Sequence, residues 1–263
     1  MSAASGYALV TGASRGIGAA FAQALAAEGQ NLILTARGAA DLERVRARIV
    51  RPGMEVQCLI ADLDRGDGAA GLLAAIAARG WTVELLVNNA GLGSGGRFDT
   101  LPLARELEEV RVNIAALVEL THGCLAGMRE RGSGAVIQVA SVAGFQALPF
   151  MATYSATKAF VLHFSLALYA EMRPLGIHVM ALCPGTTETG FFDVAGIRPA
   201  PGVGNAMASP EAVVQAALRG LRRRRAVVVC GGANRAMVAA ERLLPRPALA
   251  RIVAGVMKSW RST

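Results

Sequence analysis

The sequence predicts an α/β protein, a doubly wound Rossmann-type parallel sheet of about seven strands with helices on both faces. Short apolar runs alternate along the chain with longer helix-patterned stretches. The short runs are apolar on both faces, as in strands of a parallel sheet that is covered on both sides. With 263 residues, 53% of them hydrophobic, the chain has the length and the apolar content for a single domain, residues 1–263, with a sizeable core.

Seven apolar runs predict the strands. They are Tyr7–Thr11, Asn31–Ala36, Val56–Ala61, Leu85–Asn88, Ala135–Ala140, Ile177–Cys183 and Ala226–Cys230. The stretches between them carry helix patterns, at Ile17–Ala27, Ala40–Val50, Gly68–Ala78, Arg105–Arg131, Ala152–Arg173 and Pro210–Arg223. This alternation predicts right-handed crossovers between parallel strands.

Two stretches depart from the alternation. Gly190–Ser209 is rich in Gly and Pro and is expected to form a long loop beside the substrate. Asn234–Thr263 follows the last strand and predicts two short basic amphipathic helices, separated at Pro245 and Pro247.

The net charge of +8 is concentrated at the end of the chain. From Arg219 onward there are eleven Lys and Arg residues and one acid, Glu241, so the rest of the chain is close to neutral. A basic tail with Trp260 as its only aromatic residue disfavours nucleic-acid binding. The tail is expected to cap the substrate cleft or cover a subunit interface. Peripheral membrane contact and a solvated tail are the other interpretations.

Four scattered cysteines form no C-x-x-C pair, which favours small buried thiols in a reducing compartment. With only three histidines, the sequence offers no zinc-ligand spacing, and we expect no metal. The N-terminus lacks a signal-peptide pattern, and no uninterrupted apolar stretch of about 18 residues is present. We therefore expect a cytoplasmic protein.

The first predicted strand ends in a glycine-rich turn, TGASRGIG at residues 11–18. Gly12 permits the tight turn, Gly16 lets the backbone approach a pyrophosphate, and Gly18 lets helix and strand pack closely. The pyrophosphate then faces the positive end of the helix. The turn predicts a dinucleotide site with contacts from Gly12, Ser14, Arg15, Gly16, Ile17 and Gly18.

The second predicted strand indicates which dinucleotide binds. It ends at Thr35-Ala36-Arg37, where an NAD-binding protein usually carries an acid for the ribose 2′-hydroxyl. Arg37, with Arg15 nearby, instead suits a 2′-phosphate. NADP(H) is therefore favoured over NAD(H).

Tyr154 and Lys158 predict acid–base chemistry. Their i, i+4 spacing places them on one helix face. A nearby ammonium is expected to lower the pKa of the phenol, which then exchanges a proton with a carbonyl or alcohol oxygen. Ser141 ends a predicted strand at the edge of the sheet where ligands bind, and its hydroxyl can bond the same oxygen.

These motifs, taken in order over roughly residues 7 to 190, resemble the short-chain dehydrogenase/reductase family in its compact single-domain branch. Further matches are Asp62, Asn88-Asn89-Ala90-Gly91, Asn113 and Pro184-Gly185-Thr186-Thr187-Glu188-Thr189. Thr187 stands where family members commonly have Val, and backbone contacts should survive the change. The basic tail resembles C-terminal extensions in one bacterial branch of the family.

The resemblance implies a role for each matched residue. Asn113, Ser141, Tyr154 and Lys158 would be catalytic, with Tyr154 as acid/base, Lys158 also holding the ribose, and Asn113 anchoring a proton-relaying water. The remaining cofactor contacts would come from Asp62, Leu63, Asn89, Ala90, Gly91, Pro184, Gly185, Thr187 and Thr189. The predicted helices Arg105–Arg131 and Ala152–Arg173 resemble the family's dimer-forming pair, which implies a homodimer or homotetramer.

The expected substrate contacts are apolar, which favours a lipophilic or aromatic carbonyl over a charged small acid. The main candidates are Phe145, Phe150, Phe191 and Phe192, with Val142, Leu148, Met151 and Val194 nearby. The leading hypothesis is an NADP(H)-dependent oxidoreductase acting on CH–OH groups. A ketoacyl-thioester reductase served by an acidic acyl carrier protein and a non-catalytic NADPH sensor or scaffold remain as alternatives. A sugar-nucleotide epimerase is disfavoured because the chain lacks length for a larger substrate lobe.

Overall fold

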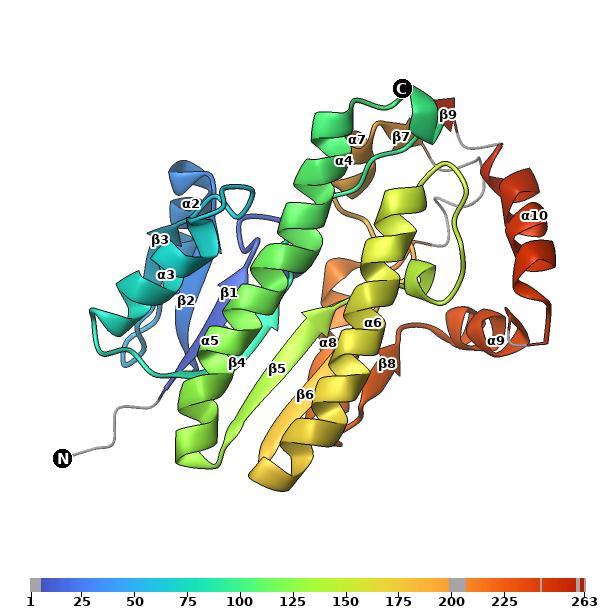
Figure 1. Ribbon diagram of the computed structural model, residues 1–263. Coiled ribbons are helices and arrows are strands. Elements are labelled where there is room, and N and C mark those ends of the chain that lie inside the picture. Colours follow the sequence, from blue (N-terminus) through green and yellow to red (C-terminus); the bar gives the residue numbers. More distant parts are fainter. Residues whose placement is uncertain (1–5, 199–206, 242, 259–260, 263) are drawn as a thin grey trace.

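The computed structural model describes residues 6–198, 207–241, 243–258 and 261–262. Its main sheet has seven parallel strands in the order β3-β2-β1-β4-β5-β6-β8 (Figure 1), which confirms the predicted fold class. The chain reverses its direction of winding between β1 and β4, where open α/β sheets place their ligands. The strand bounds are β1 Tyr7–Thr11, β2 Asn31–Ala36, β3 Val56–Ile60, β4 Val83–Asn88, β5 Gly134–Val139, β6 Ile177–Cys183 and β8 Val227–Val229.

Helices cover both faces of this sheet, and each face has its own apolar core. One core joins the sheet to α1 (Gly16–Ala27), α2 (Ala39–Ile49) and α8 (Pro210–Arg222). The opposite core joins it to α3 (Gly68–Ala77), α5 (Ala116–Arg131) and α6 (Ala152–Met172). In Figure 1, α5 and α6 lie side by side across the sheet. All seven residues of β6 are buried, and its run, apolar except for His178, correctly predicted a strand covered on both faces.

Local signals account for several helix ends. Ser209 begins α8, and its Oγ accepts a hydrogen bond from the Ala212 N–H at 3.1 Å, with Pro210 at the first helical position. Gly132 ends α5 in the left-handed conformation, with φ +65°, which costs glycine little because it has no Cβ. Short 3₁₀ turns occur at Phe98–Thr100, Val142–Gly144 and Arg173–Leu175.

The predicted single helix Arg105–Arg131 is in fact three consecutive segments. It begins as α4 (Leu103–Val110), widens into a π-helical turn at Arg111–Ala115, and continues as α5. A hydrophobic period of 3.6 residues does not reveal one wider turn. Such π segments are frequent at functional sites, and this one carries Asn113.

The predicted loop Gly190–Ser209 contains regular structure. A short helix, α7 (Phe191–Ala195), precedes a two-residue strand, β7 (Ile197–Arg198). This strand pairs antiparallel with β9 (Arg261–Ser262). Such a pairing between distant segments leaves no local sequence pattern. Residues 199–206 of the predicted loop lie outside the described residues.

The tail forms the two predicted helices. They are α9 (Gly232–Glu241) and α10 (Arg246–Met257), with Pro245 immediately before α10 and Pro247 in its first turn. Figure 1 shows both helices beyond the edge strand β8, at the side of the molecule. Among the helices of the described ranges, none has both the length and the apolar character needed to cross a bilayer.

Candidate active site

A cavity of about 910 Å³ opens over the carboxyl ends of β1, β2, β4, β5 and β6. It extends from the glycine-rich turn after β1 to the tail helices α9 and α10. The predicted turn, strand-end and catalytic-helix motifs therefore share one continuous space.

The turn after β1 needs glycine for two reasons. Gly12 and Gly16 have φ values of +61° and +54°, where other residues are strained. Gly18 has an ordinary φ, but a Cβ placed on it would lie 2.2 Å from the Gly12 carbonyl oxygen. Gly18 therefore lies behind the turn and sets how closely α1 approaches it, while Gly12, Ser14, Arg15, Gly16 and Ile17 line the cavity.

Asn89 ties the first turn to the end of β4. Its Nδ2 donates to the carbonyl oxygens of Thr11 at 2.9 Å and Gly12 at 3.2 Å. In return, the Thr11 hydroxyl oxygen accepts from the backbone N–H groups of Asn89 and Ala90 at 3.0 and 2.9 Å. These bonds connect the ends of β1 and β4, between which the winding direction reverses. Asn89, Ala90 and Gly91 also line the cavity.

Two guanidinium groups lie at the end of the cavity near β2. Arg15 and Arg37 are exposed and line it, as do Asp62 and Leu63 after β3. Arg37 forms an exposed ion pair with Glu108 at 3.5 Å. Such a pair contributes little to stability, so Arg37 can exchange this partner for a phosphate group.

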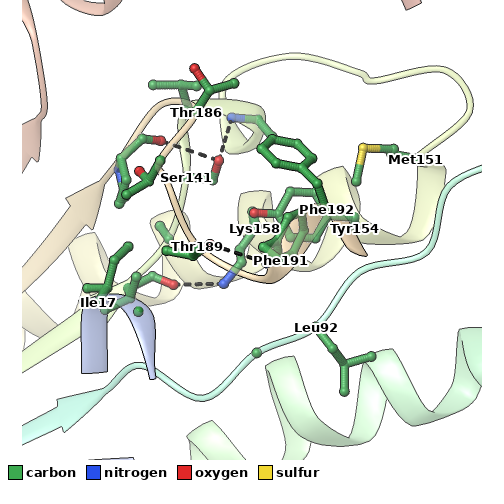
Figure 2. Close-up of a pocket in the computed structure, with 18 of the residues that line it drawn as sticks. Ile17, Leu92, Ser141, Met151, Tyr154, Lys158, Thr186, Thr189, Phe191 and Phe192 are labelled. Carbon is green, nitrogen blue, oxygen red and sulfur yellow. Dashed lines mark hydrogen bonds between the residues drawn. The ribbon is translucent and has the colours of Figure 1, made fainter. Parts of the chain in front are cut away.

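Ser141, Tyr154 and Lys158 line the middle of the cavity. Ser141 follows β5, and its Oγ accepts from the Ala143 N–H at 3.1 Å. The Lys158 Nζ donates to the Val139 carbonyl oxygen at 2.8 Å and lies 5.8 Å from the centre of the Tyr154 ring. Figure 2 shows Tyr154 and Lys158 next to each other, with Phe191 beside the tyrosine.

The expected lowering of the Tyr154 pKa by Lys158 is not what the structure shows. Burial raises the pKa of Tyr154 to about 12, with Ser141 acting in the opposite direction and Glu109 adding to the rise. Burial also lowers the pKa of Lys158 to about 8. Desolvation is therefore the largest effect on the pKa of both groups, and Tyr154 is a neutral phenol at pH 7.

Asn113 lies behind the cavity wall. Its side chain donates to the Leu92 carbonyl oxygen at 2.9 Å and to the Thr157 Oγ1 at 3.0 Å, and accepts from the Leu92 N–H at 3.0 Å. A Cβ on Gly91 would lie 3.2 Å from the Asn113 Oδ1 and 3.4 Å from the Lys158 Nζ. Asn113 thus joins the end of β4 to α6 beside the lysine.

The loop after β6 contributes Pro184, Gly185, Thr187 and Thr189 to the cavity wall. The Pro184 carbonyl oxygen accepts from the Val142 N–H at 2.9 Å. Thr187 donates through Oγ1 to the Gly185 carbonyl oxygen at 3.0 Å, and the Thr189 Oγ1 accepts from the Phe191 N–H at 3.3 Å. These bonds fix the course of the loop into α7.

Two buried carboxyl groups near Tyr154 could not be predicted from the sequence. Glu106 and Glu109 of α4 are 5% and 0% exposed. Ser94 Oγ donates to the Glu109 Oε2 at 2.9 Å and also bonds Glu106, which accepts from the Thr153 hydroxyl as well. Burial raises the pKa of Glu109 to about 7. In the sequence they appear as ordinary helix acids, so no signal marked them.

We expect Glu109→Gln to remove a pH dependence of stability. Because the folded protein holds this proton more tightly than the unfolded chain, wild-type stability is greatest below the ordinary carboxyl pKa and falls as pH rises towards about 7. At pH 8 the variant should be more stable by on the order of 2 kcal/mol, and at pH 4.5 about equal. Urea unfolding at both pH values measures this, with exposed Glu130→Gln as control. If the free energy of unfolding changed equally with pH in Glu109→Gln and wild type, this expectation would be contradicted.

The substrate candidates divide into two groups. Phe191 and Phe192 line the cavity with Val142, Leu148, Met151 and Val194. Phe145 and Phe150 are not in its lining: Phe145 packs against the core formed by α5, α6 and β6, and Phe150 packs against Met151 and the residues around α7. Phenylalanines look alike in sequence, and a local pattern does not reveal backbone features such as the φ of +68° at Phe150.

The tail supplies the remaining wall of the cavity, in agreement with the capping interpretation. Asn234 of α9 lies so close to the loop after β6 that a Cβ on Gly185 would be 2.3 Å from its Nδ2. The tail also contributes apolar residues to the wall, namely Met237, Ala240, Leu244, Leu249, Ile252, Val253, Val256 and Met257. Within the described ranges, no group of three or more His, Cys, Asp and Glu residues is arranged to hold a metal ion.

Known proteins match this chain over the fold and the site. The family model for short chain dehydrogenase matches residues 6–196. A Streptomyces virginiae protein named for ketoacyl reduction in a monensin polyketide synthase is 39% identical over 186 residues, or 69% of this chain and 70% of that protein. The matched residues include the glycine-rich turn, Ser141, Tyr154 and Lys158, whereas α9 and α10 lie beyond the family match.

Two solved structures are similar over nearly the whole chain. A short-chain dehydrogenase from Sphingobium yanoikuyae in complex with NADPH has a TM-score of 0.81 and 32% identity, covering 98% of this chain and 97% of that one. A bulky-bulky ketone specific alcohol dehydrogenase from Comamonas testosteroni has a TM-score of 0.77 and 28% identity, covering 90% and 92%. The first of these similarities includes the region of the tail, since almost all of both chains is covered.

Proposed function

Because the chain belongs to the short-chain dehydrogenase/reductase family, we propose that it is an NADP(H)-dependent oxidoreductase that reduces the carbonyl group of a lipophilic substrate. The observation that carries the proposal is that Ser141, Tyr154 and Lys158 line the same cavity as the glycine-rich turn. One space can therefore hold a dinucleotide and a substrate in contact.

The residues present fit NADP(H). The backbone at Gly12 and Gly16 leaves room that a side chain would fill, and α1 begins directly beyond them, as a pyrophosphate requires. Arg15 and Arg37 would hold the 2′-phosphate, and Asp62 and Leu63 would receive the adenine. The nicotinamide end would contact Asn89, Gly91, Lys158, Thr187 and Thr189. The NADPH bound to the Sphingobium relative supports this choice of cofactor.

In the proposed reaction, bound NADPH supplies the hydride. Tyr154 donates its phenolic proton to the carbonyl oxygen of the substrate, and the Ser141 hydroxyl orients that oxygen. Lys158 keeps a positive charge close to the tyrosine as the proton leaves, which stabilises the phenolate that forms. Asn113 is a positioning residue that holds the end of β4 against Thr157 of α6, one residue from the lysine.

The protonation state of Tyr154 suits carbonyl reduction near neutral pH. Burial raises the pKa of this phenol to about 12, so at pH 7 it carries the proton that the carbonyl oxygen takes up. The reverse oxidation of an alcohol would need the phenolate.

The name of the Streptomyces virginiae relative favours a second candidate, a ketoacyl-thioester reductase. It uses the same catalytic residues. The arginines that precede and follow β8 would then contact an acidic carrier protein.

The test is NADPH oxidation against a panel of bulky ketones, aldehydes and ketoacyl thioesters, with NADH for comparison. We expect turnover of a bulky ketone or a ketoacyl thioester, faster with NADPH. A thioester turned over far better when attached to a carrier protein would select the second candidate. NADPH binding without turnover of any panel member would reject both in favour of a sensor or scaffold.

We also propose that residues 1–263 form one domain that associates as a homodimer or homotetramer in the cytoplasm. Exposed apolar side chains on the outer faces of α4 and α6, among them Leu103, Leu107 and Phe160, support association through these helices. Four unpaired cysteines, three of them buried, support a reducing compartment.

A further inference from the structure

The cavity wall formed by the tail contains one polar group that no step of the proposed reaction uses. Glu241 is the last residue of α9 and lines the cavity. Its neighbours in the lining along the tail are the apolar side chains of Met237, Ala240 and Leu244, and α10 contributes Leu249 and Ile252. A carboxyl group therefore lies within an apolar wall.

Glu241 is half-buried as a residue, but its carboxyl oxygens have almost no exposure and no hydrogen-bond partner among the described residues. Burial raises its pKa above the ordinary range of a glutamate. Leaving a buried acceptor unbonded costs roughly 1–3 kcal/mol, and more when the group is charged. Buried polar groups with no partner are rare in proteins, so each one calls for an explanation.

We propose that Glu241 is a specificity-determining residue that accepts a hydrogen bond from a hydroxyl group of the carbonyl substrate, an inference that rests on the proposed function. The hydroxyl lies on the part of the substrate that faces the tail, away from the reacting carbonyl at Tyr154 and Ser141. The substrate class is then a bulky, mostly apolar ketone that carries a hydroxyl group. The apolar wall binds its skeleton, and Glu241 fixes which way round it enters.

The charge around the site favours a neutral hydroxyl over an ammonium group. Eleven Lys and Arg residues lie from Arg219 to the end of the chain, with Glu241 as the single acid. At the cofactor end of the same cavity Arg15 and Arg37 are accompanied by Asp41 and Asp62, and Lys158 adds a further positive charge in the middle. A cationic substrate would approach against this potential, whereas a neutral donor would not.

The experiment compares two bulky ketones with the same skeleton, one with a hydroxyl group distant from the carbonyl and one without. Rates are measured for wild type, Glu241→Leu, Glu241→Gln and the control Glu130→Leu, which changes an exposed glutamate of α5 outside the cavity lining. We expect wild type and the control to prefer the hydroxyketone in kcat/KM by at least about tenfold. Glu241→Leu should abolish this preference, and Glu241→Gln, which keeps an acceptor oxygen, should retain part of it.

Calorimetric binding of both ketones to the NADP⁺-saturated proteins separates this inference from the proposed reaction. One outcome is that the hydroxyketone binds more strongly than the plain ketone, through Glu241, although neither ketone is turned over. That outcome would support the hydroxyl site but contradict the proposed reaction. Equal binding of the two ketones to wild type would overturn the inference, as would a Glu241→Leu variant that keeps the preference. Tighter binding of an amine analogue than of the hydroxyketone would overturn the assignment to a neutral donor.

Discussion

Replacing Tyr154 with phenylalanine is expected to lower kcat for carbonyl reduction by about a thousandfold, the contribution of a well-placed proton donor. The substitution removes only the phenolic oxygen. The ring keeps its packing against Phe191, whose centre lies 5.0 Å away, so the cavity should keep its shape. The affinity for NADPH should change by no more than about threefold, because the loss falls on the transition state.

Single-turnover rates and NADPH binding measure the two parts of this prediction separately. The matched control is Tyr169→Phe, which removes the hydroxyl of another tyrosine of the same helix outside the cavity lining. The pH dependence adds a second test. With a Tyr154 pKa of about 12, the phenol keeps its proton between pH 6 and 9, so a fall in the reduction rate above about pH 8 would follow the loss of charge on Lys158, whose pKa is about 8. Unchanged turnover in Tyr154→Phe would argue for a different proton donor.

The double replacement Arg15→Ala and Arg37→Ala is expected to raise KM for NADPH by about a hundredfold with little change in kcat. Each guanidinium contributes a charge-assisted hydrogen bond to the 2′-phosphate, worth roughly 1.5 kcal/mol at an exposed position. Two such losses, about 3 kcal/mol, correspond to roughly a hundredfold in affinity. NADH lacks this phosphate, so its KM should change by no more than about threefold.

Initial rates with both cofactors provide the measurement. Arg48→Ala is the control, since Arg48 is an exposed arginine of α2 outside the cavity lining. An equal rise of KM for NADPH and NADH would mean that the two arginines act on the pyrophosphate or on the fold. In that case, the two arginines would not be the cause of the predicted preference for NADPH.

The sequence predicts the parts of the fold that depend on local periodicity. β1, β2 and β6 begin and end where their predicted runs do, because strands buried on both faces are mostly apolar along their whole length. The turn at residues 11–18 is equally readable, since few backbone geometries place three glycines between a strand and a helix. The same holds for Tyr154 and Lys158, whose spacing is fixed by one helical turn.

Features that depend on distant contacts could not be predicted. The strands β7 and β9 are each two residues long, and the paired residues Arg198 and Arg261 lie 63 positions apart in the sequence. Burial of Glu109 is set by α4 packing near Ser94 and Thr153, which charge patterns do not reveal. The pKa of Tyr154 could not be read from the sequence for a related reason: desolvation is a property of the assembled site, whereas the sequence reveals only the spacing of a neighbouring lysine.

The position of the tail has a consequence for how such proteins diversify. The family match ends at residue 196, and the cavity beyond it is completed by α9 and α10, which supply none of the proposed catalytic groups. Mutations in these two helices can therefore reshape substrate choice while the proton donor and the dinucleotide turn stay intact. Exchange of the last thirty or so residues between homologues is thus a natural route to new substrate ranges, in evolution and in the construction of chimeric enzymes.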